Sequence, residues 1–128
     1  FHESILKGKY ECFLKEDTAL PMMYMPDAIR ATIQMMESPA EKIKIRSSYN
    51  LAGISFTPKQ IAEEVTKHLP NFEMTYNPDS RQEIANSWPS SIDDSYAKKD
   101  WGWQLKYNLE KMSSDMIQNL KRQYKQTV

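Results

Sequence analysis

The sequence contains few of the residues on which cofactor and redox chemistry commonly depends. Among 128 residues there are three glycines, two histidines and one cysteine. Gly8, Gly53 and Gly102 lie far apart, so they cannot form the glycine-rich turn that holds a dinucleotide pyrophosphate between a strand and a helix. A single cysteine cannot form an internal disulfide. We therefore expect no cofactor-binding residue and no disulfide in this chain.

Metal chemistry has equally little support. His2 and His68 are distant in sequence, and no cysteine or carboxylate stands at ligand spacing from either. Cys12 occupies an apolar position in a strand-like alternation, which favours a place in the core over a reactive thiol. We expect no metal site.

Charge and hydropathy exclude two further classes of partner. Lysine and arginine number 17, as do aspartate and glutamate, and no basic stripe with interleaved aromatic residues is present. No run approaches the roughly 18–20 apolar residues of a membrane helix. We expect a soluble chain of one domain, with no nucleic-acid partner and no membrane span.

Hydrophobic periodicity predicts short strands that alternate with helices. The expected strands cover residues 9–14, 22–25 and 72–76, with further strand-like stretches in 43–52. The expected helices cover residues 28–37, 58–69, 80–87 and 95–100, and a longer one follows Asn108. This order is typical of an α/β layer rather than of a helical bundle or a β-sandwich.

Helix boundaries are marked with unequal clarity. Thr57, Pro58 and Gln60 predict an N-cap, a first helical residue and a capping box. Asp27 is also expected to be an N-cap, ahead of an apolar helix face. That face is formed by Ile29, Thr32, Ile33 and Met36.

One tyrosine–lysine pair has the spacing of a catalytic pair, but its expected position in the chain argues against a catalytic role. Tyr107 and Lys111 have the Tyr-x-x-x-Lys spacing that can lower the pKa of a phenol. Asn108, between them, is expected to cap a helix, which leaves Tyr107 outside the first turn. Asp93 and Asp94 are expected to be helix caps. We therefore expect no catalytic residue in this chain.

Two segments nevertheless resemble one enzyme family. Residues 20–32, Leu-Pro-Met-Met-Tyr-Met-Pro-Asp-Ala-Ile-Arg-Ala-Thr, resemble a segment of the extended short-chain dehydrogenase/reductases, and particularly of the L-threonine 3-dehydrogenases in that family. Residues 87–103, with Ser-Trp-Pro, Asp-Asp-Ser and Asp-Trp-Gly-Trp, resemble the family's closing pattern. Tyr49-Asn50 and residues 55–58 match as well. The resemblance extends from residue 1 to about residue 109.

The resemblance implies an α/β fold in which substrate binding and cofactor binding belong to different parts of the enzyme. Residues 1–128 would be the C-terminal, substrate-binding portion of an NAD-dependent dehydrogenase/epimerase-like enzyme whose Rossmann half is absent. The glycine-rich loop and the catalytic Ser or Thr and Tyr-x-x-x-Lys set would lie before Phe1, so this chain alone is expected to be inactive. The full-length enzyme would transfer a hydride from C3 of L-threonine to NAD⁺, giving 2-amino-3-ketobutyrate. Family members commonly form homodimers through the absent part, and bacterial cytoplasm or mitochondrial matrix would suit such an enzyme.

Four residues are candidates for the substrate pocket. Met22 and Tyr24 share one face of an expected strand, and Arg81 and Trp88 flank a short helical segment. For Met22, Tyr24 and Trp88 the alternative is a place in the core. The remaining tryptophans, Trp101 and Trp103, are expected to be packing anchors.

Two other functions remain open at this point. The first is a nucleotide-sugar epimerase or dehydratase of the same family. Those enzymes usually carry a diphosphate-binding Arg seven residues before the capping Asp, where this chain has Leu20, and the loss of that guanidinium favours a small substrate. The second is a non-catalytic α/β interaction module.

Overall fold

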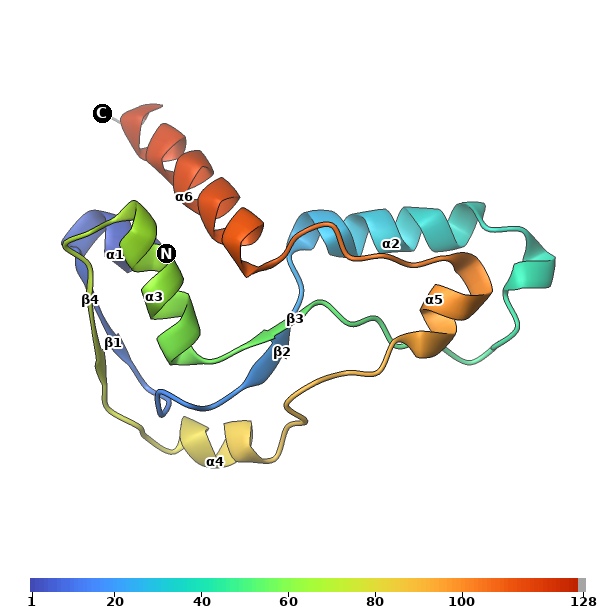
Figure 1. Ribbon diagram of the computed structural model, residues 1–128, viewed down its shortest axis with the longest axis horizontal. Coiled ribbons are helices and arrows are strands. Elements are labelled where there is room, and N and C mark those ends of the chain that lie inside the picture. The colour runs from blue at the N-terminus through green and yellow to red at the C-terminus, as the bar shows by residue number, and fades with distance from the viewer. Residues whose placement is uncertain (127–128) are drawn as a thin grey trace.

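The computed structural model describes residues 1–126 and contains two small sheets with helices placed around them (Figure 1). The strands are β1 (Lys9–Cys12), β2 (Leu20–Met22), β3 (Ile54–Phe56) and β4 (Glu73–Tyr76). The α-helices are α1 (His2–Lys7), α2 (Met25–Glu37), α3 (Pro58–His68), α4 (Arg81–Asn86), α5 (Ser95–Trp101) and α6 (Leu109–Gln126), and the 3₁₀ helix η1 covers Ala40–Lys42. The α/β prediction is confirmed.

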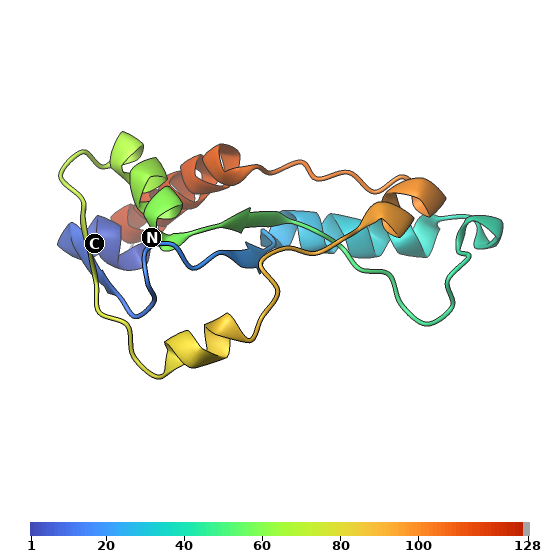
Figure 2. The ribbon, with the colours of Figure 1, turned by 60° about the horizontal axis from the view of Figure 1, so that its bottom comes forward.

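Each sheet joins segments that are far apart in the chain. β1 and β4 are parallel, with Lys9 opposite Glu73 and Cys12 opposite Tyr76. β2 and β3 are antiparallel, with Met22 opposite Ile54. Both views place α1, α3 and α6 around the β1–β4 pair at one end, α2 and α5 at the other, and β2–β3 between them (Figure 2).

Two groups of buried side chains correspond to these two ends. One group joins α2 to α5 and the segment that follows it, and consists of Ala31, Ala97, Trp101 and Trp103. Trp101 is 5% exposed and Trp103 is fully buried, so their prediction as packing anchors is confirmed. The other group contains Cys12, Leu14 and Ala85, which confirms Cys12 as a core residue.

Local helix signals were predicted well. The Thr57 hydroxyl accepts the Gln60 N–H at 3.2 Å, and the Gln60 side-chain oxygen accepts the Thr57 N–H at 2.9 Å, completing the capping box. Gly102 closes α5 with φ 76°, the left-handed conformation that favours glycine. The Asn108 side chain accepts the Lys111 N–H at 2.9 Å, as expected of a cap.

Two strand predictions were wrong. Residues 22–25 are not a strand, because β2 ends at Met22 and α2 begins at Met25. Residues 43–52 contain no strand either. There the Tyr49 hydroxyl accepts the N–H groups of Lys44 and Ile45, at 2.9 and 3.1 Å. The strand forms at Ile54–Phe56 instead, where the backbone can pair with β2.

The apolar face of α2 exists, but the chain leaves it in solvent. Ile29 is 54% exposed, Ile33 49% and Met36 81%. The buried residues of the helix are Asp27 and Ala31, on its other side. A polar residue therefore occupies the core-facing side of this helix.

We predict that Thr57→Ala lowers the free energy of unfolding by about 0.5–2 kcal/mol, because a helical N–H loses its side-chain acceptor. Urea denaturation of the 128-residue chain measures this. Thr57→Ser, which keeps the hydroxyl, serves as the control and should stay close to the parent. An unchanged midpoint in Thr57→Ala would contradict the observed helix start.

Candidate functional site

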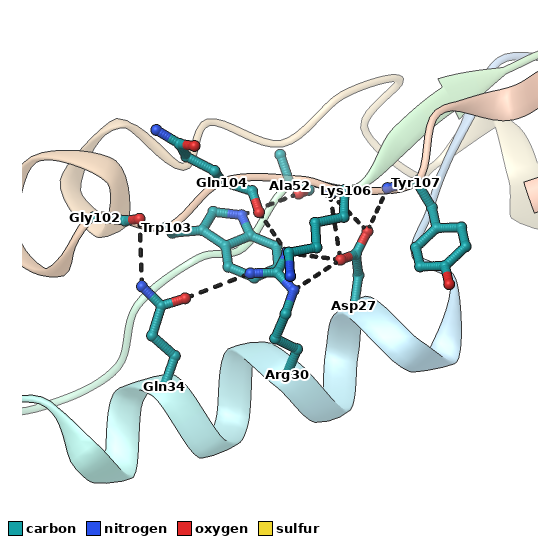
Figure 3. A network of polar contacts seen from close by, with 9 residues as sticks. All are labelled: Asp27, Arg30, Gln34, Ala52, Gly102, Trp103, Gln104, Lys106 and Tyr107. Carbon is teal, nitrogen blue, oxygen red and sulfur yellow. Dashed lines mark hydrogen bonds and ion pairs between the residues drawn. The ribbon is translucent and has the colours of Figure 1, made fainter. Parts of the chain in front are cut away.

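The corner between β2 and α2 carries two of the four pocket candidates and is held by a buried carboxylate (Figure 3). Asp27 was predicted to be an N-cap, and this was wrong. The helix begins at Met25, three residues earlier than predicted, so the Asp27 side chain lies in the first turn and points to the chain ahead of α6. There it accepts the Lys106 N–H at 3.1 Å and the Tyr107 N–H at 2.9 Å.

Asp27 is fully buried, and the lowered pKa of its carboxyl makes it ionised at neutral pH. Burial alone would raise the pKa of its carboxyl. The hydrogen bond from Arg30, followed by those from Tyr107 and Lys106, outweighs burial and holds the pKa below its ordinary value. The Arg30 guanidinium lies 2.6 Å from the Asp27 carboxylate. Every charge in this contact therefore has a partner.

Two further side chains of α2 continue the contact along the same segment. The Arg30 guanidinium donates to the Gln104 carbonyl and lies over the Trp103 ring, 4.6 Å from its centroid. The Gln34 amide donates to the Trp101 carbonyl at 3.1 Å. We call this set of contacts, from Asp27, Arg30 and Gln34 to residues 101–107, the Asp27 clamp. It fixes α2 against the segment between α5 and α6.

The pocket candidate Tyr24 contacts both α6 and the segment that precedes it. Its hydroxyl donates to the Asp115 carboxylate of α6 at 2.6 Å, and its ring meets the Tyr107 ring edge-on at 4.9 Å. Burial, and after it the hydrogen bond to Asp115, raises the pKa of Tyr24 to about 12. The Tyr24 hydroxyl is therefore neutral at physiological pH and already engaged by α6.

The Arg81 side chain also binds neighbouring side chains of this chain. Its Nε lies 3.0 Å from both oxygens of Asp79, and its guanidinium carbon lies 3.4 Å from the centroid of the Phe13 ring. The hydrogen bond from Arg81 lowers the pKa of Asp79. Asp79 therefore occupies the Nε and one Nη2 donor of Arg81, and the guanidinium keeps further N–H donors on its exposed side.

Met22 and Trp88 present free apolar surface. Met22 is 42% exposed and Trp88 is 55% exposed, so the core alternative is wrong for both. The chain just beyond Trp88 is tied to β3, because the Ser55 hydroxyl donates to the Ser90 carbonyl. A cavity of about 110 Å³ lies between this segment and the β2–β3 pair. It is lined by Pro21, Ala52, Gly53, Ile54, Ser55, Ser91 and Ile92.

The four candidates therefore do not form one polar cluster. Tyr24 and Arg81 bind different partners, and Met22 and Trp88 contribute exposed apolar groups. The cavity beside β2 is smaller than the roughly 300–1,000 Å³ of a complete ligand pocket. Sequence reasoning missed Asp115 and the buried role of Asp27, since both depend on contacts between distant segments.

The three glycines do not offer a dinucleotide site. Gly8 and Gly102 close the C-terminal ends of helices in the left-handed conformation. Gly53 allows close approach of two strands, since a Cβ there would lie 2.1 Å from the Met22 carbonyl oxygen. None of them stands in a turn that opens a helix, as a pyrophosphate site requires. The glycines of this chain therefore do not form a pyrophosphate-binding turn.

Residues 1–126 lack two further kinds of feature, a metal-binding cluster and a membrane-spanning helix. His, Cys, Asp and Glu side chains do not gather in threes anywhere in this range in a way that could hold a metal ion. Within the same residues, no helix combines the length and apolar character needed to cross a membrane.

Comparison with known proteins identifies the type of fold. No family model matches the sequence. The GalE-like L-threonine dehydrogenase of Cupriavidus necator superposes with a TM-score of 0.89 and 58% identity, over 93% of this chain and 43% of that one. The L-threonine dehydrogenase of Phytophthora infestans superposes with a TM-score of 0.92 and 46% identity, over 96% and 40% of the two chains. The fold is that of the C-terminal part of a GalE-like extended short-chain dehydrogenase/reductase.

Proteins of similar sequence indicate which members of this fold the chain resembles. Bovine mitochondrial L-threonine 3-dehydrogenase is 50% identical over 118 residues, which are 91% of this chain and 31% of that protein. A Staphylococcus haemolyticus protein named as an uncharacterized epimerase/dehydratase is 45% identical over 91% of this chain and 37% of its own length. The chain thus spans about a third of the curated relatives it matches. It is similar in sequence to the C-terminal part of the L-threonine 3-dehydrogenases.

The contact between Tyr24 and Asp115 predicts an unusual titration. The raised pKa means that this contact stabilises the fold below the ordinary tyrosine pKa of about 10 and is lost as pH rises through 12. In Asp115→Asn we expect the Tyr24 pKa to fall toward 10, though not fully, because burial remains. Ultraviolet titration of the phenolate measures it, with Tyr24→Phe identifying the signal. An unchanged pKa in Asp115→Asn would contradict the hydrogen bond.

Proposed function

We propose that this chain forms the substrate-side part of an NAD-dependent L-threonine 3-dehydrogenase. In the proposed reaction C3 of L-threonine gives a hydride to NAD⁺ and its hydroxyl gives up a proton, so that 2-amino-3-ketobutyrate and NADH form. NAD and the catalytic groups are assigned to a dinucleotide-binding part outside residues 1–128, because the chain's own glycines do not fit a pyrophosphate.

One observation carries this proposal. Identity of 45–58% to several proteins named L-threonine dehydrogenase extends over more than nine-tenths of the chain. In contrast, an NAD-dependent NDP-hexosamine 5,6-dehydratase superposes with a TM-score of 0.71 at only 11% identity, which supports a shared fold alone. Leu20 adds to the argument, since an aliphatic side chain at this position cannot hold a diphosphate.

The four pocket candidates take different roles in this proposal. Met22 and Trp88 would cover the substrate with apolar surface and exclude water from it. Tyr24 would shape the pocket with its ring, because its hydroxyl is bound to Asp115. Arg81 would offer a substrate carboxylate the N–H donors that Asp79 does not occupy. The small cavity beside β2 suggests that this chain supplies one wall of the pocket.

A chimera tests the proposal. This chain would replace the matching part of the Cupriavidus necator enzyme, and NADH formation with L-threonine would be followed at 340 nm, with the parent enzyme as control. We expect the chimera to oxidise L-threonine. A folded chimera that binds NAD⁺ without oxidising L-threonine would contradict the proposal, and stabilisation by a UDP-sugar alone would favour a nucleotide-sugar enzyme.

We predict that Trp88→Ala in this chimera raises KM or lowers kcat/KM while the melting temperature stays within about 2 °C of the parent chimera. Its exposed side chain contributes little to the core, whereas a group that closes over substrate acts on kinetics. Trp101→Ala is the matched control, because removal of that buried indole should lower the free energy of unfolding by about 3–5 kcal/mol. Normal kinetics in Trp88→Ala would remove Trp88 from the pocket.

A further inference from the structure

The short helix α4 and the turn that follows it carry two of the four pocket candidates, Arg81 and Trp88. Only two side chains of this helix are buried, those of Gln82 and Ala85. We propose that Gln82 is a positioning residue for the proposed reaction. By fixing α4 on the segment between β1 and β2, it sets where Trp88 meets L-threonine. The inference rests on the proposed function, since it takes the substrate from it.

The buried Gln82 amide has hydrogen-bond partners at both of its ends. Its Oε1 accepts the backbone N–H of Lys15 at 2.8 Å. Its Nε2 donates to the Thr18 hydroxyl at 3.0 Å and to the Asn86 side-chain oxygen at 2.7 Å. A buried amide is costly unless it is hydrogen-bonded, so the side chain is held where these partners lie. We call the hydrogen bonds to Lys15 and Thr18 the Gln82 contact.

The other contacts of α4 with distant segments define its position less sharply. Ala85 packs with Cys12 and Leu14, but apolar contact has no preferred direction, so it allows the helix to slide or turn. The Arg81 guanidinium lies over the Phe13 ring on a long side chain that is 52% exposed and can follow a moving helix. Among the side chains of α4, Gln82 therefore supplies the hydrogen bonds that join the helix to a distant part of the described chain.

The position of α4 is passed directly to Trp88. The Trp88 N–H donates to the Ala85 carbonyl at 3.1 Å, and the Ser87 hydroxyl donates to the Ile84 carbonyl at 2.7 Å. These bonds continue the last turn of the helix up to Trp88, whose side chain is 55% exposed and has no place in the core. Trp88 therefore moves with α4. Since a small displacement of a substrate-positioning group has a large effect on turnover, the Gln82 contact acts on the pocket from a distance.

Two substitutions remove the contact from its two sides, and we call them the contact variants. Gln82→Met keeps the length of the side chain without its hydrogen-bonding groups, and Thr18→Val removes the hydroxyl on the opposite segment. In the chimera with the Cupriavidus necator enzyme, we expect each to raise the KM for L-threonine by roughly three- to tenfold, with kcat and the KM for NAD⁺ within about twofold of the parent chimera. The double variant should add little to the larger single effect, because both changes break one contact.

The matched control is Gln60→Met at the start of α3. It makes the same substitution and removes the same kind of bond, since the Gln60 side-chain oxygen accepts the Thr57 N–H at 2.9 Å. We expect this variant to lose stability and to keep the parent KM for L-threonine. A general loss of stability is thereby separated from displacement of α4.

Fluorescence of the 128-residue chain follows Trp88 without any enzymatic activity. The sequence has three tryptophans, and Trp101 and Trp103 are buried, so the exposed indole is that of Trp88. Time-resolved anisotropy measures its motion, and Trp88→Phe identifies its share of the signal. We expect a larger fast-decaying fraction in both contact variants than in the parent chain, and no such increase in the control.

Unchanged anisotropy and an unchanged KM for L-threonine in the contact variants would overturn the inference, even if those variants lost stability. Fully additive effects on KM in the double variant would overturn the claim that the two residues form one contact. If Gln82→Met does not fold, the milder Thr18→Val decides by the same measurements. A parent chimera that folds and binds NAD⁺ without oxidising L-threonine would contradict the proposed function, whereas the anisotropy still decides whether Gln82 holds Trp88.

Discussion

The arrangement of this chain depends on one buried carboxylate and the groups that neutralise it. Asp27 is completely shielded from water, and an ionised carboxylate in such a place is tolerated only when it is paired and hydrogen-bonded. Its partners are Arg30 on the same helix and two backbone N–H groups that lie 79 and 80 residues further along the chain. The contact therefore holds the start of α2 to the approach to α6.

Several other features follow from that contact. Residues 101–107 run along α2, which brings Trp103 into a fully buried position and Tyr107 against Tyr24. Asp115 on α6 then lies within reach of the Tyr24 hydroxyl. The same contact leaves the opposite, apolar side of α2, with Ile29, Ile33 and Met36, exposed. A polar interaction thus sets both the shape of the β2–α2 corner and the outward orientation of the apolar side of α2.

The sequence predicted what is local and failed where the partner is distant. Thr57, Gly102 and Asn108 were predicted correctly because capping and left-handed conformations involve neighbours within a few residues. Asp27 was misassigned because an aspartate ahead of an apolar helix face is often an N-cap, and its true partners lie 79 and 80 residues further along the chain. The exposure of Met22 and Trp88 and the engagement of Tyr24 by Asp115 likewise depend on how distant segments pack.

The central claim is that the ionised Asp27 carboxylate holds α2 to residues 106–107. The most direct test compares the free energies of unfolding of the parent chain and of Asp27→Asn, measured by urea denaturation at several pH values. The lowered pKa of Asp27 means that this stabilisation is complete above the ordinary carboxyl pKa of about 3.9 and is lost as pH falls through the lower pKa of the folded state. We expect Asp27→Asn to be less stable by about 1–3 kcal/mol at pH 7, with the difference shrinking in acid below pH ~4. Equal stability of the two proteins at pH 7, or a difference that does not change with acid, would contradict the account.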